Sequence, residues 1–400
     1  MNKSLLSYLQ DNKPTMIQHL YDFCSINSGS DNLLGLNAMR EALQKAFSPL
    51  SSQMESSHLR PFSTLDMSGH PILQASGDTL LIRKRSHLKR RVLLSGHMDT
   101  VYGEHHPFQT LTQVHENQII GPGVADMKGG LIVMLYALKA FETTPFASLI
   151  GWDVFLNADE ELGSPSSGPL LNQLSTQYET ALVFEPAMTP EGTIAKNRKG
   201  SGKLTLIATG KAAHAGRSFD EGRNAICHLA KAITHIQALN HTRPGVTLNV
   251  GQISGGEALN VVPDKAVVKL DVRISDPKDE GWVRKKLSEI LLTLQEEGFS
   301  LTLHGEFGRP VKHVNQATRA LFRRVQSIGK SLGLNLHWQD SGGCCDGNNL
   351  ALHGIPVLDT LGVRGGRIHS SEEFILLDSL VERAALSALL LVELAKERVT

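Results

Sequence analysis

Two histidines and four carboxylates of this 400-residue chain are the kinds of side chain that hold divalent metal ions: His97, Asp126, Glu160, Glu161, Glu185 and His369. Imidazole and carboxylate ligands suit zinc, with cobalt or manganese as plausible substitutes. One catalytic zinc needs about three protein ligands, so this set could hold two ions if one carboxylate bridges them. Three ligand carboxylates and a bridging hydroxide would balance two divalent cations, which leaves Glu160 free for acid–base chemistry.

Several of these residues also have an ordinary alternative. His97 and Asp99 are two residues apart, so on an extended strand they point the same way, and the pair could serve stability alone. Taken alone, the pair favours that interpretation, but it could also hold His97 in one tautomer for a metal. Asp126 precedes a helix and could be its N-cap. Asp159, Glu160 and Glu161 could form a solvated acidic loop, although consecutive acids are costly unless water or a cation neutralises them.

Apolar runs that predict strands buried on both faces precede several of these residues. Val92–Gly96 leads to His97, Gly151–Asn157 leads to the acidic triplet, and Thr180–Phe184 leads to Glu185. Apolar residues at helical spacing follow Asp126, and small residues in Asp-Met-Lys-Gly-Gly130 would let that helix pack closely. The pattern predicts an open mixed α/β sheet flanked by helices, with polar groups at the carboxyl ends of the strands, where such sheets bind ligands.

A different pattern begins near Lys199. Alternating and helical segments follow in the order β-α-β-β-α-β, which is the ferredoxin-like arrangement, and the chain then returns to the first pattern after Pro310 with a helix over 315–332 and a closing helix over Leu377–Arg398. We therefore predict a discontinuous catalytic domain of residues 1–198 and 311–400, with an inserted ferredoxin-like α+β domain of residues 199–310.

Composition bounds the class of protein. The chain is 41% hydrophobic, and 40 basic residues balance 40 acidic ones, which favours a globular protein without electrostatic steering to nucleic acid or membrane. The basic run Arg83–Arg91 contains no aromatic residues, so a charged hairpin turn is the better interpretation. No signal peptide or membrane span is expected. Four cysteines without metal or redox spacing suggest reduced thiols and a cytoplasmic setting.

Five segments in order carry a family resemblance: Gly96-His-Met-Asp-Thr-Val101, Gly121-Pro-Gly-Val-Ala-Asp-Met-Lys-Gly-Gly130, Asn157-Ala-Asp-Glu-Glu-Leu-Gly-Ser164, Glu185-Pro186 and His369-Ser370. Together they resemble the M20 family of dinuclear zinc peptidases, and most of all its carboxypeptidase G2 (glutamate carboxypeptidase) branch. The resemblance covers nearly the whole chain and implies a catalytic domain like that of zinc aminopeptidases.

The resemblance implies a role for each residue of the set. Asp126 would bridge two zinc ions, with His97 and Glu185 on one ion and Glu161 and His369 on the other. Asp99 would orient His97, and Glu160 would be the general base. The peptide bond between Asp126 and Met127 would be cis.

The inserted domain of such enzymes contributes further residues. In Gly210-Lys-Ala-Ala-His-Ala-Gly216, His214 matches a histidine that reaches the active site of the partner subunit, so a homodimer through this domain is implied. Asn260 and Arg273 match residues that grip the substrate's carboxylate. For Arg273, a salt bridge on the strand surface is the alternative interpretation.

The implied activity is hydrolysis of an amide next to a free carboxylate, by a carboxypeptidase acting on a peptide or an N-acyl amino acid. An N-acyl-amino-acid deacylase of the acetylornithine or succinyl-diaminopimelate type is the alternative. A binding module that has lost its chemistry would lack a ligand or the base, and none is missing. The loop Gly342–Asn349 departs from the Gly-Gly-Thr-Asp pattern usual in the branch, so its side-chain preference does not carry over.

Overall fold

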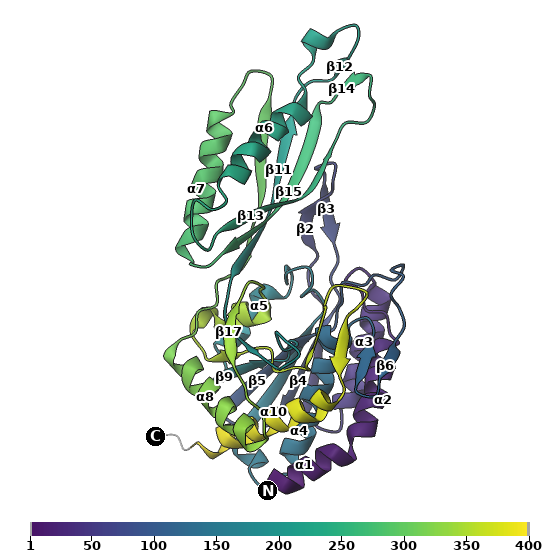
Figure 1. Ribbon diagram of the computed structural model, residues 1–400, viewed down its shortest axis with the longest axis vertical. Helices are drawn as coiled ribbons and strands as arrows, with labels where there is room; N and C mark the ends of the chain where they lie inside the picture. The colour runs from purple at the N-terminus through teal and green to yellow at the C-terminus, as the bar shows by residue number, and fades with distance from the viewer. Residues whose placement is uncertain (1, 398–400) are drawn as a thin grey trace.

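The computed structural model describes residues 2–397, and the chain forms two units stacked along its long axis (Figure 1). The lower one, here called the central-sheet unit, contains both chain ends. The upper one, the four-stranded unit, spans residues 200–309. Met1 and residues 398–400 fall within the predicted catalytic domain but lie outside the described residues. They include Arg398, the predicted end of the last helix.

A six-stranded mixed sheet forms the middle of the central-sheet unit. Its strand order is β1-β4-β8-β5-β9-β18; β8, β5, β9 and β18 run parallel, while β1 and β4 pair antiparallel. The strands are β1 (Gln53–Ser57), β4 (Thr79–Lys84), β5 (Arg91–His97), β8 (Gly151–Asn157), β9 (Thr180–Val183) and β18 (Val357–Leu358). The prediction of a mixed α/β sheet flanked by helices is confirmed.

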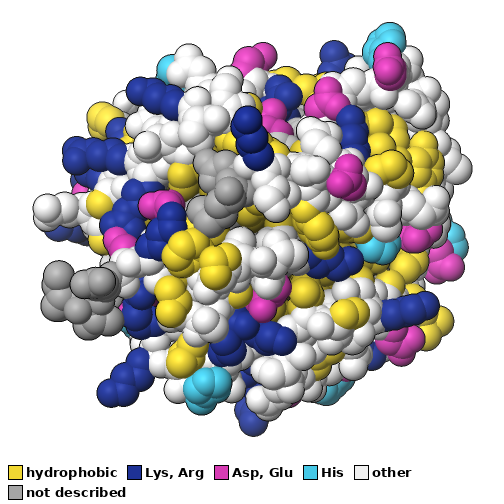
Figure 2. Space-filling view, turned by 90° about the horizontal axis from the view of Figure 1, so that it is seen from below, with side chains coloured by type: hydrophobic (Ala, Val, Ile, Leu, Met, Phe, Trp, Pro, Cys, Tyr) yellow, Lys and Arg dark blue, Asp and Glu magenta, His cyan; other side chains and the backbone are white. Residues whose placement is uncertain are grey.

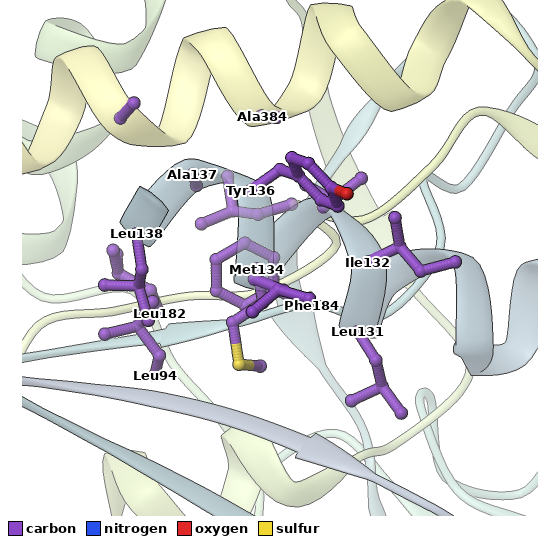
Figure 3. Packing of buried hydrophobic residues seen from close by; sticks show 14 of the residues in the cluster. Leu94, Leu131, Ile132, Met134, Tyr136, Ala137, Leu138, Leu182, Phe184 and Ala384 are labelled. Carbon is purple, nitrogen blue, oxygen red and sulfur yellow. The ribbon is translucent and has the colours of Figure 1, made fainter. Parts of the chain in front are cut away.

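Helices cover both faces of this sheet, which is why its middle strands are mostly apolar. Every residue of β8 and β9 is buried. On one face α4 packs between the sheet and α10, with Leu131, Met134 and Leu138 beside the strand residues Leu94 and Leu182 (Figure 3). On the other, α5 and α9 pack on a smaller cluster. The unit's helices are α1 (Asn2–Asp11), α2 (Lys13–Cys24), α3 (Leu33–Phe47), α4 (Gly130–Glu142), α5 (Gly168–Ser175), α8 (Gln316–Ser331), α9 (Asp346–Leu350) and α10 (Asp378–Lys396).

The start of α4 lies against the end of β9 with no room for a side chain. A Cβ on Gly130 would stand 2.0 Å from the carbonyl oxygen of Phe184, and one on Gly129 would stand 2.4 Å from that of Val124. The predicted close packing of the Gly-Gly pair is confirmed. It brings the turn that carries Asp126 next to the strand that delivers Glu185.

Replacing Gly130 with alanine should therefore destabilise the protein although alanine is the better helix former. A backbone oxygen cannot move aside, so α4 must shift away from β9, which we expect to cost about 1–3 kcal/mol. The matched control is Gly281→Ala on α7 (Lys278–Thr293), where a Cβ meets nothing within 4 Å; it should gain about 0.5–1 kcal/mol. Denaturant unfolding of both variants measures the difference, and equal midpoints would contradict the packing argument.

The four-stranded unit has its own antiparallel sheet and core. Two helices, α6 (Ala225–Ala238) and α7, pack on one face of strands β11 (Gly200–Thr209), β13 (Thr247–Gly255), β15 (Lys265–Ile274) and β16 (Ser300–Arg309). The sheet order β13-β15-β11-β16 with chain order β-α-β-β-α-β has the ferredoxin-like connectivity. The domain boundaries at 198/199 and 310/311 stay a prediction.

The charged segment between β4 and β5 differs from expectation, because β8 lies between these two strands. Arg83–Arg91 is therefore not a hairpin turn. Its arginines instead pair with acids of neighbouring elements: Arg85 with Glu142 at 2.6 Å, and Arg91 with the buried Asp153. On the face nearest the chain ends, basic side chains are likewise interspersed with acidic and hydrophobic ones (Figure 2).

Short elements complete the chain. A small sheet has the order β19-β20-β7-β6, and three two-stranded pairs are β2–β3, β10–β17 and β12–β14. Among residues 2–397, no helix is long and apolar enough to cross a membrane. The bounds are β2 (Phe62–Leu65), β3 (Pro71–Gln74), β6 (Thr112–His115), β7 (Gln118–Ile120), β10 (Ile194–Arg198), β12 (Ala213–His214), β14 (Val261–Val262), β17 (Trp338–Ser341), β19 (Gly365–Gly366), β20 (Phe374–Leu376), and single turns at Val124–Gly129, Ala147–Leu149, Phe219–Glu221 and Ala351–His353.

Candidate metal centre and active site

His97 ends β5 at the carboxyl edge of the central sheet, where it is buried. Its Nδ1 lies 2.9 Å from the backbone oxygen of Asp99 and 3.3 Å from that residue's Oδ1. Both partners are acceptors, so Nδ1 carries a proton, and Nε2 faces the cluster. There Nε2 lies 3.1 Å from Asp126 Oδ1 and 3.8 Å from Glu185 Oε1.

Asp126 stands between two sets of potential ligands. Its Oδ1 faces His97, whereas its Oδ2 lies 3.4 Å from His369 Nε2, which is in turn 3.1 Å from Glu161 Oε2. Asp126 belongs to the turn Val124–Gly129, which precedes α4, so it is not the helix N-cap. Its peptide bond to Met127 is cis, as the resemblance implied.

In the acidic triplet after β8, Asp159 has a different environment from Glu160 and Glu161. Asp159 turns away from the cluster and accepts hydrogen bonds from Ser166 N and Ser167 N at 2.8 and 3.0 Å. Asp99 holds the other two through their backbones, because its carboxylate accepts from the amides of Glu160 and Glu161 at 3.2 and 3.1 Å. Asp99 therefore orients both His97 and the turn that presents Glu160 and Glu161.

Glu160 is held by an arginine from the end of the four-stranded unit. Arg309 Nη2 donates to Glu160 Oε1 at 2.7 Å, and its other terminal nitrogen donates to Asp346 and, at 2.8 Å, to Asn349. No hydrogen bond within residues 2–397 engages Glu160 Oε2. Burial raises the pKa of Glu160 to about 7, although the Arg309 charge lowers it. A carboxylate with one anchored oxygen and a pKa near neutrality can take up and release a proton.

The cluster concentrates negative charge in a buried place, which only cations relieve. Burial and then the Asp126 charge raise the pKa of Glu161 to about 8 and that of Glu185 well above its usual range. Hydrogen bonds to Asp126 and Glu161 raise the pKa of His369 to about 11. Glu161 Oε1 is buried and has no hydrogen-bond partner within residues 2–397. Two overlapping groups have ligand atoms within 4.8 Å of one another: His97 with Glu160 and Glu185, and His97 with Asp126 and Glu161. Imidazole and carboxylate donors so placed fit divalent metal ions.

A family model described as peptidase family M20/M25/M40 matches residues 93–393, more than half of the chain. The chain belongs to this family. Carboxypeptidase G2 of Pseudomonas sp. (strain RS-16) is 25% identical over 386 residues, which are 96% of this chain and 90% of the relative. Succinyl-diaminopimelate desuccinylase 1 of Alteromonas mediterranea is 27% identical over 329 residues, or 76% and 81% of the two chains.

The fold agrees with this assignment. A tripeptidase structure from Staphylococcus aureus superposes with a TM-score of 0.76 at 22% identity, covering 96% of this chain and 99% of that one. Membership of the M20 family confirms the predicted family and an enzyme of the metallopeptidase class. The metal-ligand roles assigned above by resemblance stay predictions that the geometry suits.

Three residues predicted for the M20 site lie on the four-stranded unit, outside the cluster. His214 and Asn260 are exposed on the segments around β12 and β14, at the far end of that unit from the central sheet (Figure 1). They adjoin each other, since Ala215 N donates to Asn260 O at 2.9 Å. Arg273 donates to both carboxylate oxygens of Asp271, which is the salt bridge given above as the alternative interpretation of this residue. Arg273 also donates to Cys344 Sγ at 3.0 Å. It thereby contacts the atypical glycine-rich loop.

Sequence reasoning missed four residues around the M20 cluster: Arg309 and Asp346 beside Glu160, and Tyr102 and Glu373 behind Asp126. Arg309 ends an ordinary strand, and nothing in its neighbourhood signals a partner 149 positions away. Asp346 lies in the glycine-rich loop that the sequence does single out. Glu373 comes four positions after His369, which is the one local cue that it shares a loop with a ligand.

Proposed function

We propose that this chain is a two-metal amidohydrolase that cleaves an amide bond next to a free carboxylate, as a carboxypeptidase on a peptide or an N-acyl amino acid. The observation that carries the proposal is the two-sided setting of Asp126, whose oxygens face His97 with Glu185 on one side and His369 with Glu161 on the other. These five residues would hold the ions, zinc being the metal that they suit best.

The chain's own residues supply the remaining chemistry. Bound metal ions would supply Lewis-acid activation of a water molecule and of the scissile carbonyl. Glu160 would take a proton from the attacking water at Oε2, while Arg309 holds Oε1. The same oxygen would then pass that proton to the leaving nitrogen as the carbon–nitrogen bond breaks. Asp99 would keep His97 in the tautomer that leaves Nε2 unprotonated.

The four-stranded unit would complete the site from a second copy of the chain. His214 Nδ1 accepts hydrogen bonds from Gly216 N and Arg217 N at 3.1 and 3.2 Å. The proton therefore sits on Nε2, which could donate to an oxyanion. Asn260, which adjoins His214, would come from the same copy as His214. Arg273 would come from the chain that carries the metal cluster, where it contacts Cys344. Both would bind the substrate carboxylate, and only Arg273 can pair with it bidentately. β12, which carries His214, lies at the end of the four-stranded unit away from the central sheet (Figure 1), so His214 would reach a cluster only in a second copy of the chain.

We expect His214→Ala to lower kcat by about 10²–10³-fold, the usual effect of losing one oxyanion donor. Arg273→Ala should lower kcat/KM by a similar factor, mainly by raising KM, because it removes a group that binds the substrate carboxylate. When the two variants are mixed and re-assorted, each mixed dimer regains one intact site, because His214 comes from one chain and Arg273 from the other. His235→Ala, on an exposed position of α6, is the matched control. Mixed dimers that stay inactive would contradict a site shared between subunits.

A substrate panel tests the proposed function directly. Metal-loaded protein would be assayed against dipeptides, N-acyl amino acids with acidic, basic and apolar side chains, and the same compounds with the carboxylate amidated. We expect hydrolysis only where the carboxylate is free. Selective cleavage of small N-acyl groups would favour the deacylase alternative, which the desuccinylase relative supports. Equal rates on the amidated compounds would reject the proposal.

The cytoplasmic setting suggested by the cysteines stays a prediction.

A further inference from the structure

Glu373 is a buried carboxylate directly behind the turn that carries Asp126. Its Oε1 accepts hydrogen bonds from the backbone amides of Ala125 and Asp126 at 2.9 and 3.0 Å. Its Oε2 lies 2.7 Å from the hydroxyl of Tyr102. Both carboxylate oxygens are therefore engaged, and Glu373 touches the backbone of Asp126 rather than its carboxylate.

The backbone of Glu373 is fixed as firmly as its side chain. Its carbonyl oxygen accepts from Gly121 N at 3.0 Å, and β20, which follows at once, pairs with β7. Tyr102 is the second link, because its hydroxyl also lies 2.9 Å from the carbonyl oxygen of Ser370, next to His369. Glu373 and Tyr102 thus connect the loop that bears His369 to the turn that bears Asp126.

The turn needs such support because the helix does not provide it. Asp126 and Met127 have non-helical backbone angles, with φ of −113° and −132°, and α4 begins only at Gly130. The amides of Ala125 and Asp126 are the donors that Glu373 accepts, and both residues are buried. Buried amides without a partner are strongly disfavoured, so without Glu373 the turn would rearrange, and the direction of the Asp126 carboxylate with it.

We propose that Glu373, held by Tyr102, is a positioning residue that fixes the Asp126 carboxylate and the His369 loop in the relative placement that a second metal ion requires. The inference rests on the proposed function only in assuming that the cluster binds two ions. It predicts that loss of Glu373 weakens one metal ion more than the other. His97 ends β5 and Glu185 follows β9, so the central sheet positions the ligands of the first ion. His369, a ligand of the second ion, depends on the loop that Glu373 anchors.

The test measures metal binding, independently of hydrolysis. Metal-free Glu373→Ala would be titrated with Zn²⁺ against a chromophoric chelator, and with Co²⁺ while its absorption bands are recorded. We expect the affinity for the second ion to fall about 10–100-fold, as for other residues that orient metal ligands. Glu373→Gln keeps an acceptor for both amides and should restore binding to within about threefold of wild type. Tyr102→Phe should weaken it about fivefold, the effect of one buried hydrogen bond.

Asp279→Ala is the matched control, since Asp279 is a buried carboxylate on α7 of the other unit, paired with Arg243. It should leave both metal affinities unchanged. Wild-type affinity in folded Glu373→Ala would overturn the proposal; if that variant does not fold, wild-type affinity in Tyr102→Phe would do so. Equal losses in Glu373→Ala and Glu373→Gln would assign the effect to charge and also overturn it. Two bound ions without amide hydrolysis in wild type would count against the proposed function alone.

Discussion

Glu160→Gln should lower kcat by about 10²–10⁴-fold while both metal ions stay bound. Glutamine has nearly the shape of glutamate and can still accept the hydrogen bond from Arg309 on its oxygen, but it cannot take a proton from water. The substrate should bind about as well as before, because Glu160 would act only as bonds change. Steady-state kinetics and metal analysis of the same preparation measure both properties.

The neighbouring residue gives the sharpest control for this variant. Glu161→Gln differs by one position in the same turn, yet it removes a carboxylate that faces His369 at 3.1 Å. It should therefore lose metal content, whereas Glu160→Gln should keep it. If Glu160→Gln retained turnover within about threefold of wild type, or if both variants lost metal equally, Glu160 would not be the base.

The same role sets the direction of the pH dependence. A general base works only when it is deprotonated, so kcat should fall as pH drops through the pKa of Glu160. That pKa is raised to about 7 in the metal-free protein, and two cations nearby would lower it. We expect the acidic limb of the kcat profile below pH 7. A limb above pH 7 in the metal-loaded enzyme would contradict this assignment.

Residues that follow buried parallel strands could be predicted because local sequence determines them. β5, β8 and β9 are mostly apolar runs, and the carboxyl ends of parallel strands that pair with one another lie at the same edge of the sheet. His97, Glu160, Glu161 and Glu185 meet there for that reason. Their exact roles came from the family resemblance and not from the periodicity of the sequence.

Partners that act across the fold left no such signal. Arg309 reaches Glu160 from another sheet, and Glu373 acts on backbone amides, which carry no side-chain pattern to read. The hairpin expected between β4 and β5 was wrong because strand neighbours in a mixed sheet depend on the long-range insertion of β8.

Removing the metal ions should abolish hydrolysis, and restoring them should release protons. In the metal-free protein the pKa of His369 is raised to about 11 by Asp126 and Glu161, and that of Glu161 to about 8 by burial and Asp126. At pH 7 both groups are therefore mostly protonated, and both must lose their protons to bind a cation. Asp126 contributes little, because hydrogen bonds from the two histidines hold its pKa below the usual range against the effect of burial.

The sign follows directly from these shifts. Raising the pH removes the competing protons, so metal affinity should increase by about tenfold per pH unit for each proton released. Calorimetry in buffers of different ionisation enthalpy counts those protons, and a His369→Ala variant should release fewer. Metal binding without proton release at pH 7 would mean that His369 and Glu161 are not ligands. Hydrogen bonds from protonated His369 and Glu161 would then hold the cluster together without metal. The two-metal mechanism would lose two of the ligands of one ion.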